Sequence, residues 1–219
     1  MDDLARRRRP RRYAGKSLKR EFAVLAGFDP GAIVLTDGGP MPLAWLAQGD
    51  RVLTQAGGYE PVVWVERTRL QLSAIADLPE LAPIEVAPGL LGKNVPDRTL
   101  TVSPSQLIHV ARDPVEGAGP GVLIPAAALG TPVDLATRPT TDEIAYVSVL
   151  LPDHHLLQVD GAWMGSLFLA DLAADLGPDD PIWGAFGGRV MKPVAPILGR
   201  REAVQFLAAR AAAQAGQSA

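Results

Sequence analysis

The chain has 219 residues, of which 47% are hydrophobic, and it contains no cysteine. This length favours one domain or two small ones, and the apolar fraction is that of a globular protein rather than of a disordered chain. The absence of cysteine excludes disulfide bonds, a thiolate metal site and a cysteine nucleophile.

Charge is distributed unevenly, although the formal net charge is only −3. Residues 1–20, the basic arm, carry nine Lys and Arg against two Asp, a net charge of +7, whereas residues 21–219 carry 12 basic and 22 acidic residues, a net charge of −10. Because like charges repel and Pro10 interrupts any helix, we expect the arm to be mobile. It suits binding to nucleic acid or to an anionic surface, or it is a solvated tail that folds back on the acidic body. Its arginines are Arg6, Arg7, Arg8, Arg9, Arg11, Arg12 and Arg20.

An apolar run follows the basic arm, but it is short. Phe22–Phe28 spans seven residues, includes a glycine and is followed at once by Asp29 and Pro30, which is the lower limit for the apolar part of a signal peptide. No stretch approaches the roughly 18 apolar residues that a membrane span needs. We therefore expect a cytoplasmic protein without a transmembrane segment.

Proline and glycine are spread along the chain, which is typical of many short strands joined by turns. Residues 33–36 form a β-favouring run that ends in a turn signal at 37–40. Residues 50–66 are typical of two strands around a hairpin turn at Gly57-Gly58. Further strands are expected at 99–103, 107–111, 122–124, 144–151 and 155–160. We expect the last two of these to pair with each other around Pro152-Asp153.

The pattern changes after residue 165. A short apolar turn at 125–129 still belongs to the β region, but residues 167–176 and 200–213 have helical spacing, and 214–219 are expected to fray. The sequence thus predicts the basic arm at 1–20, a mostly β domain at 21–165 and a small helical extension at 166–219 packed on that domain.

Residues that carry chemistry are few. No Gly-x-Ser-x-Gly turn is present, so a catalytic triad would have to be assembled from the scattered Ser103, Ser105, Ser148 and Ser166. The three histidines are His109, His154 and His155. Neighbouring strand residues point to opposite faces, so Asp153 and His155 share a face and give at most two metal ligands. We therefore prefer to interpret the histidine as a structural residue held by hydrogen bonds. We expect no cofactor and no metal ion.

Seven segments in chain order resemble the conserved blocks of the Hint domain, the fold that inteins share with the Hedgehog autoprocessing domain. The variety with the greatest similarity is the bacterial one common in alphaproteobacteria, which opens with Cys-Phe-x-x-Gly-Thr, a strand, a turn and Leu-x-x-Gly-Asp-x-Val-x-Thr. The resemblance covers about residues 26–205. The segments that carry it are Gly27–Thr36, Pro42–Thr54, Leu100–Gln106, Val122–Leu129, Tyr146–His155, Gly161–Phe168 and Gly199–Ala203.

The resemblance implies an all-β, horseshoe-like fold and an acyl shift, in which the first residue's side chain attacks the preceding carbonyl while a histidine protonates the leaving amide nitrogen. Carried over by position, the nucleophile falls on Gly27, which has no side chain. The histidine of the second block, which follows Ser103, falls on Gln106. A later strand histidine falls on Val147 or Ser148. Of the last block, Asp153 and His155 remain.

Three hypotheses follow for function. The first is a Hint domain that has lost its nucleophile and its acid and serves as a non-catalytic scaffold or interaction module with an unknown protein partner. The second is an active self-cleaving domain that uses a substitute nucleophile, a remote serine or Thr36, together with His155. The third is an adaptor that binds nucleic acid or a membrane surface through the basic arm. His109 does not replace the missing histidine, because its offset of three from Gln106 predicts the opposite strand face.

Overall fold

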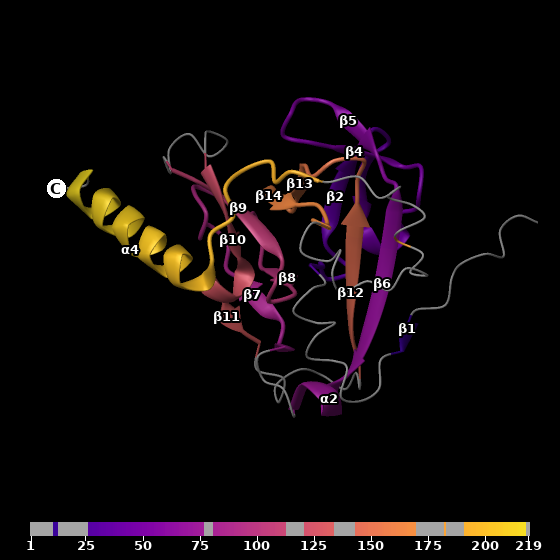
Figure 1. The fold of residues 1–219 in the computed structure, drawn as a ribbon, viewed down its shortest axis with the longest axis horizontal. Coiled ribbons are helices and arrows are strands. Elements are labelled where there is room, and N and C mark those ends of the chain that lie inside the picture. Colours follow the sequence, from indigo (N-terminus) through magenta and orange to yellow (C-terminus); the bar gives the residue numbers. More distant parts are fainter. Residues whose placement is uncertain are drawn as a thin grey trace, which may run out of the picture.

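The computed structural model describes residues 11–12, 26–76, 81–112, 121–133, 143–169, 182 and 191–217. Short strands dominate these residues, and helices are confined to a few places (Figure 1). Among the described helices, none combines the length and the apolar character that a membrane span requires. Of the basic arm, only β1 (Arg11–Arg12) is described, and it pairs in parallel with Thr68 and Arg69; the other arm residues lie outside the described part.

The largest sheet has the strand order β10-β9-β14-β13-β2-β4-β5, with β3 paired to β2. Its first half comprises β2 (Ile33–Thr36), β3 (Gly39–Pro42), β4 (Arg51–Leu53) and β5 (Tyr59–Pro61). Its second half comprises β9 (Leu107–Ala111), β10 (Gly121–Pro125), β13 (Leu156–Val159) and β14 (Ala162–Gly165). The 3-10 turn η1 (Leu43–Trp45) follows β3, and η3 (Ala126–Ala128) follows β10.

Two three-stranded sheets lie beside the large one. The first has the order β1-β6-β12, with β6 at Trp64–Gln71 and β12 at Glu143–Leu150. The second has the order β11-β7-β8, with β7 at Ile84–Val86, β8 at Leu100–Val102 and β11 at Thr131–Pro132. Helix α2 (Leu72–Ala76) follows β6 directly. The fold is therefore mostly β, as the sequence predicts.

The expected hairpin at Gly57-Gly58 is present, and the turn signal at 37–40 forms a second hairpin. Strands β2 and β3 pair around Asp37-Gly38, and Gly39 has φ of +102°, a value that glycine adopts without strain. Strands β4 and β5 pair around Gly57-Gly58, and Gly57 has φ of +89°. Residues 64–66 belong instead to β6, a third strand.

The expected pairing of residues 144–151 with 155–160 is wrong. Strand β12 pairs with β6 over eight positions, from Glu143 opposite Gln71 to Leu150 opposite Trp64, and β13 pairs with β14 and touches β2. Pro152 has no backbone N–H with which to continue a ladder, so the chain leaves one sheet there and enters another.

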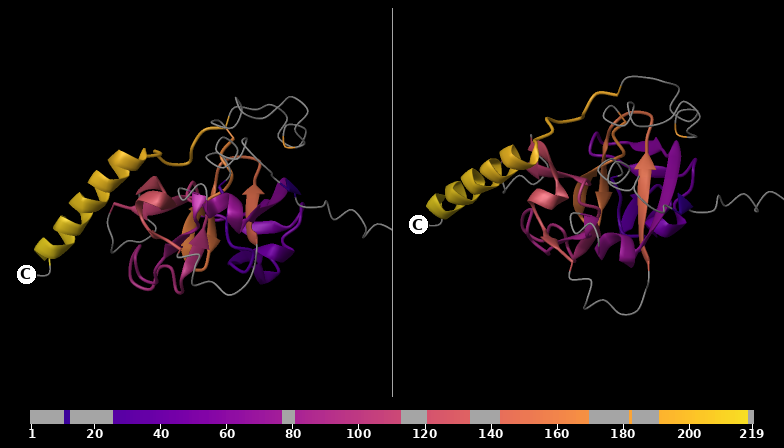
Figure 2. Two further views of the ribbon diagram at one scale, coloured as in Figure 1. Left: turned by 90° about the horizontal axis from the view of Figure 1, so that it is seen from below. Right: turned by 60° about the horizontal axis from the view of Figure 1, so that its bottom comes forward.

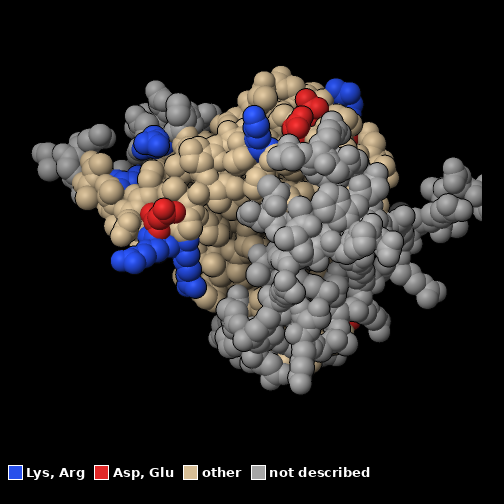
Figure 3. All heavy atoms as spheres, in the orientation of Figure 1, with Lys and Arg blue, Asp and Glu red and all other residues tan. Residues whose placement is uncertain are grey.

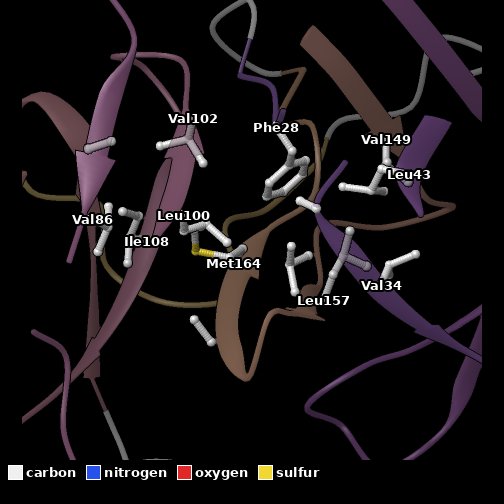
Figure 4. Close-up of a cluster of buried hydrophobic side chains, with 14 of the residues drawn as sticks. Phe28, Val34, Leu43, Val86, Leu100, Val102, Ile108, Val149, Leu157 and Met164 are labelled. Atoms are coloured by element: carbon white, nitrogen blue, oxygen red, sulfur yellow. The ribbon is translucent and has the colours of Figure 1, made fainter. Parts of the chain in front are cut away.

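The main hydrophobic core lies between the sheets (Figure 4). Phe28 is 1% exposed and its ring lies among side chains from several strands, including Val102, Leu157 and Met164. Two smaller clusters surround Leu70 and Leu150. Because apolar burial is the main stabilising term in folding, this core sets the relative position of the three sheets.

The C-terminal part ends in α4 (Arg200–Gln217), which extends away from the sheets in Figures 1 and 2. Ala203 is fully buried, and Phe206 and Leu207 pack on the core, one turn further along the same face. The helix confirms the expected helix at 200–213, but the fraying expected from residue 214 is wrong up to Gln217. Residues 167–169 are not helical, and the rest of the helix expected at 167–176 lies outside the described residues.

Candidate functional site

Gly27 lies at the junction of the two small sheets. Its backbone N–H donates to Ser103 Oγ over 3.0 Å, and its carbonyl accepts from the Ser103 N–H over 2.8 Å. The next residue, Phe28, exchanges backbone hydrogen bonds of 3.0 and 2.9 Å with Val147 of β12. Residues 27–29 therefore act as a short connecting strand between β8 and β12, and the motif position of the nucleophile is built into the sheet.

The space beside Gly27 is closed. A Cβ atom at this position would lie 2.9 Å from Tyr146 Cβ and 3.3 Å from Ser148 Oγ. Carbon atoms in proteins do not approach so closely without displacement of one of them. Of the two candidate positions for the strand histidine, Val147 contributes its backbone to Phe28, whereas the Ser148 hydroxyl faces Gly27.

Gln106 is fully buried in the turn before β9. Its side-chain amide donates two hydrogen bonds, to the carbonyls of Leu107 at 3.0 Å and Gly165 at 2.9 Å, and its backbone N–H donates to the Ser103 carbonyl at 3.1 Å. Among the described residues its Oε1 has no partner. A neutral amide with both N–H groups committed to carbonyls holds the turn against β14 and does not exchange protons near neutral pH.

The histidine that faces the interior is His154, not His155. His154 is 3% exposed, its Nδ1 accepts a hydrogen bond of 3.2 Å from the Val194 N–H, and its ring centroid lies 4.9 Å from that of Phe168. Its Nε2 lies 3.1 Å from the Cβ position of Gly165, the residue whose carbonyl binds Gln106. The structure thus brings Gln106 and His154 to the two sides of Gly165.

Burial lowers the pKa of His154 to about 4, with a smaller contribution from the charge of neighbouring His155. The cause is the cost of removing an imidazolium ion from water, so this ring is neutral at neutral pH.

Asp153 and His155 are less enclosed than the motif predicts. Asp153 is exposed, and His155 is half-buried with its backbone N–H donating to Ser166 Oγ at 3.1 Å. Strand alternation does not separate the two histidines, because Leu156 and Leu157 at the start of β13 are both buried.

His109 is buried in β9, where its Nε2 would lie 2.5 Å from a Cβ placed on Gly121 of β10. Burial lowers its pKa as well. The ring therefore packs against β10, whereas Gln106 binds β14, and His109 does not substitute for a histidine at position 106.

The hydroxyl groups considered as substitute nucleophiles have structural partners. Thr36 Oγ1 donates to the Gly39 carbonyl at 2.7 Å within the β2–β3 turn. Ser166 Oγ accepts the backbone N–H of His155, not a proton on its ring. Ser103 accepts the Gly27 N–H, and Ser105 is half-buried beside it in the chain. Within the described ranges no group of three or more His, Asp and Glu residues could hold a metal ion.

Charged side chains are dispersed on the face that Figure 3 shows. The described Lys and Arg residues on this face are separated by uncharged surface and by acidic groups, without one continuous basic patch.

Fold and site together define an all-β domain of the Hint type. A family model described as "Hint domain" matches residues 26–171, and the chain belongs to this family. The match ends before α4, so the C-terminal helix lies outside the family region.

Solved structures of inteins are also similar. The crystal structure of gp41-1 intein matches with a TM-score of 0.40 and 13% sequence identity, covering 64% of this chain and 98% of that one. The crystal structure of MchDnaB-1 intein matches with a TM-score of 0.39 and 13% identity, over the same shares of the two chains. No curated protein matches the chain.

Proposed function

We propose that this Hint domain does not cleave the peptide bond before residue 27 and serves as a non-catalytic scaffold or interaction module. The observation that carries the proposal is Gly27, which has no side chain and whose Cβ position is closed by Tyr146 and Ser148. An acyl shift needs a nucleophilic oxygen or sulfur on the residue that follows the broken bond. A glycine provides neither.

The residue in the acid's position supports the same conclusion. Both side-chain N–H groups of Gln106 donate hydrogen bonds to backbone carbonyls. Departure of an amide nitrogen requires a proton, and a carboxamide does not supply one near neutral pH. Nucleophile and acid are thus both replaced by residues that hold the fold together.

The second candidate is self-cleavage by a substitute hydroxyl. Two hydroxyl groups lie at the junction: Ser148 Oγ, 3.3 Å from the Cβ position of Gly27, and Ser103 Oγ, 3.0 Å from the Gly27 nitrogen. In that contact the oxygen is an acceptor of the Gly27 N–H, which fixes the strand in place. A serine is a weak nucleophile without a base to take its proton, and two of the three described imidazoles lie elsewhere, that of His154 at Val194 and that of His109 against Gly121.

Trapping with hydroxylamine separates these two candidates. Full-length protein is incubated with hydroxylamine at neutral pH and its mass is measured, with Ser103→Ala as the matched control. Scaffold function predicts that each of the two proteins keeps its own single, uncleaved mass. An ester at the junction would instead yield residues 27–219 and a hydroxamate on residue 26 in the wild type, and loss of this product in the control would identify Ser103 as the nucleophile.

The adaptor function through Arg6, Arg7, Arg8, Arg9, Arg11 and Arg12 requires a separate test. Binding of duplex DNA and of vesicles with anionic lipid is measured for the full chain and for a variant without residues 1–20. Adaptor function predicts binding that is lost with the arm and that weakens steeply with salt, because phosphate contacts release counterions. Equal binding by both proteins would exclude it.

A further inference from the structure

The segment between Met191 and Gly199 follows the edge of the large sheet. The Leu123 N–H donates to the Pro196 carbonyl at 2.8 Å, and the Leu198 N–H donates to the Leu123 carbonyl at 2.9 Å, so that residues 196–198 run parallel to β10. Met191, at the other end of the segment, is 3% exposed. Between these two anchors, the hydrogen bond from the Val194 N–H to His154 Nδ1 joins the segment to the body.

This hydrogen bond needs a neutral imidazole. Because Nδ1 accepts from the Val194 N–H, the single proton of the ring is on Nε2. A second proton would occupy Nδ1 and turn it into a donor that faces another donor. The imidazolium ion would also be 97% buried, since His154 is 3% exposed. Protonation therefore breaks the contact and favours a state in which the ring reaches water.

We propose that His154 is an acid-sensitive attachment point for the C-terminal segment: its protonation releases residues 192–195, between the two anchors, while the strands of the large sheet stay paired. The proposal does not depend on whether the junction before Gly27 is cleaved.

The charged groups around the ring set the direction of the response. A positive charge on the neighbouring His155 opposes a second charge on His154. Lys192 of the segment and Asp153 are both exposed, so solvent screens their charges. Phe168 and Gly165, which lie against the ring, carry no charge.

The size of the effect follows from linkage. The closed state holds the pKa of His154 at about 4, whereas a released ring has the ordinary value of 6.5. Between these values the open state binds the proton and the closed state does not, so lowering the pH favours opening. The ratio of open to closed segment should rise about 20-fold from neutral pH to about pH 5.

Hydrogen exchange of the full-length protein measures this ratio. Pro193 and Pro196 have no amide hydrogen, so a peptide over residues 192–196 reports on Val194 and Ala195 alone. After correction for the intrinsic pH dependence of exchange, we expect protection at Val194 to fall about 20-fold between neutral pH and about pH 5. Amides of β13 should exchange more slowly than Val194 at both pH values.

Two variants control the experiment. His154→Asn keeps an acceptor near the Nδ1 position and does not titrate, so its Val194 protection should be the same at both pH values. His155→Asn should keep the pH response. Should His154→Asn fail to fold, an NMR titration of the wild-type ring carbons and the Val194 amide tests the same coupling.

Three results would overturn the proposal. The first is an unchanged Val194 protection in the wild type. The second is the same pH response in His154→Asn. The third is exchange of Val194 and the β13 amides at one common rate, because opening would then be global unfolding.

Discussion

Gly27 and Tyr146 approach so closely that a Cβ atom on residue 27 would lie 2.9 Å from Tyr146 Cβ. The position from which a Hint nucleophile would act is therefore filled from the side by strand β12. Residues 27–29 also join β8 to β12, and Phe28 is part of the main core. Gly27 therefore serves as part of a structural connection between the two small sheets.

The closed position predicts that Gly27→Ala destabilises the fold. The added methyl group must displace Tyr146 or the connecting strand, and such overpacking costs about 1–3 kcal/mol. The free energy of unfolding in urea measures the effect. Gly58→Ala is the matched control, because no heavy atom lies within 4 Å of its Cβ position. A Gly27→Ala variant as stable as this control would contradict the steric argument.

Ser103→Ala should also destabilise the protein. It leaves the buried N–H of Gly27 without its acceptor, and an unsatisfied buried donor costs about 1–3 kcal/mol. Ser103→Thr keeps the hydroxyl and should recover most of the loss. Equal stability of the alanine variant and the wild type, measured by urea denaturation, would show that the Ser103 contact contributes nothing.

A third prediction concerns Gln106. Gln106→Met preserves the length of the side chain but removes both donors to the Leu107 and Gly165 carbonyls, and we expect a loss of about 1–3 kcal/mol. Gln48→Met, at an exposed position, should change stability by less than about 0.5 kcal/mol. Thermal unfolding of both variants provides the comparison. Similar melting temperatures would argue against a structural role for Gln106.

Global stability should decrease in acid because of His154. Its pKa is about 4 in the folded state and 6.5 in the unfolded chain, so its contribution is complete above pH 6.5 and is lost as the pH falls toward 4. The expected loss at about pH 4.5 is about 2–3 kcal/mol. Carboxylates titrate in the same range, so the measured quantity is the difference between wild type and His154→Asn. A difference that does not change with pH would refute the assignment.

Much of the fold follows from local pattern. Residues 33–36 and 107–111 have the bounds of β2 and β9, because alternating or continuous β-favouring residues are flanked there by turn formers. Strand β3 was not predicted, since Gly39–Pro42 contains two prolines and no periodic signal. The partners of β12 and β13 were mispredicted because pairing depends on contacts between distant segments, which the local sequence does not record.

The site was predictable only as a set of positions. The motif order identifies Gly27, Ser103 and Gln106, and the structure places the first two in hydrogen-bond contact. Which of the two adjacent histidines is buried was not predictable from strand alternation, because Leu156 and Leu157 are both buried; the motif contains His155, whereas the structure encloses His154. The closure of Gly27 by Tyr146 arises from packing between residues 119 positions apart, which no local pattern reveals.

The measurement that tests the central proposal most directly is the intact mass of the full-length protein, freshly purified and after days at neutral pH, with and without an added thiol. If the junction lacks both the nucleophile and the acid, we expect one unchanged mass for residues 1–219 under all conditions. A fragment that begins at Gly27 would contradict this proposal and would show that another group has taken over the acyl shift.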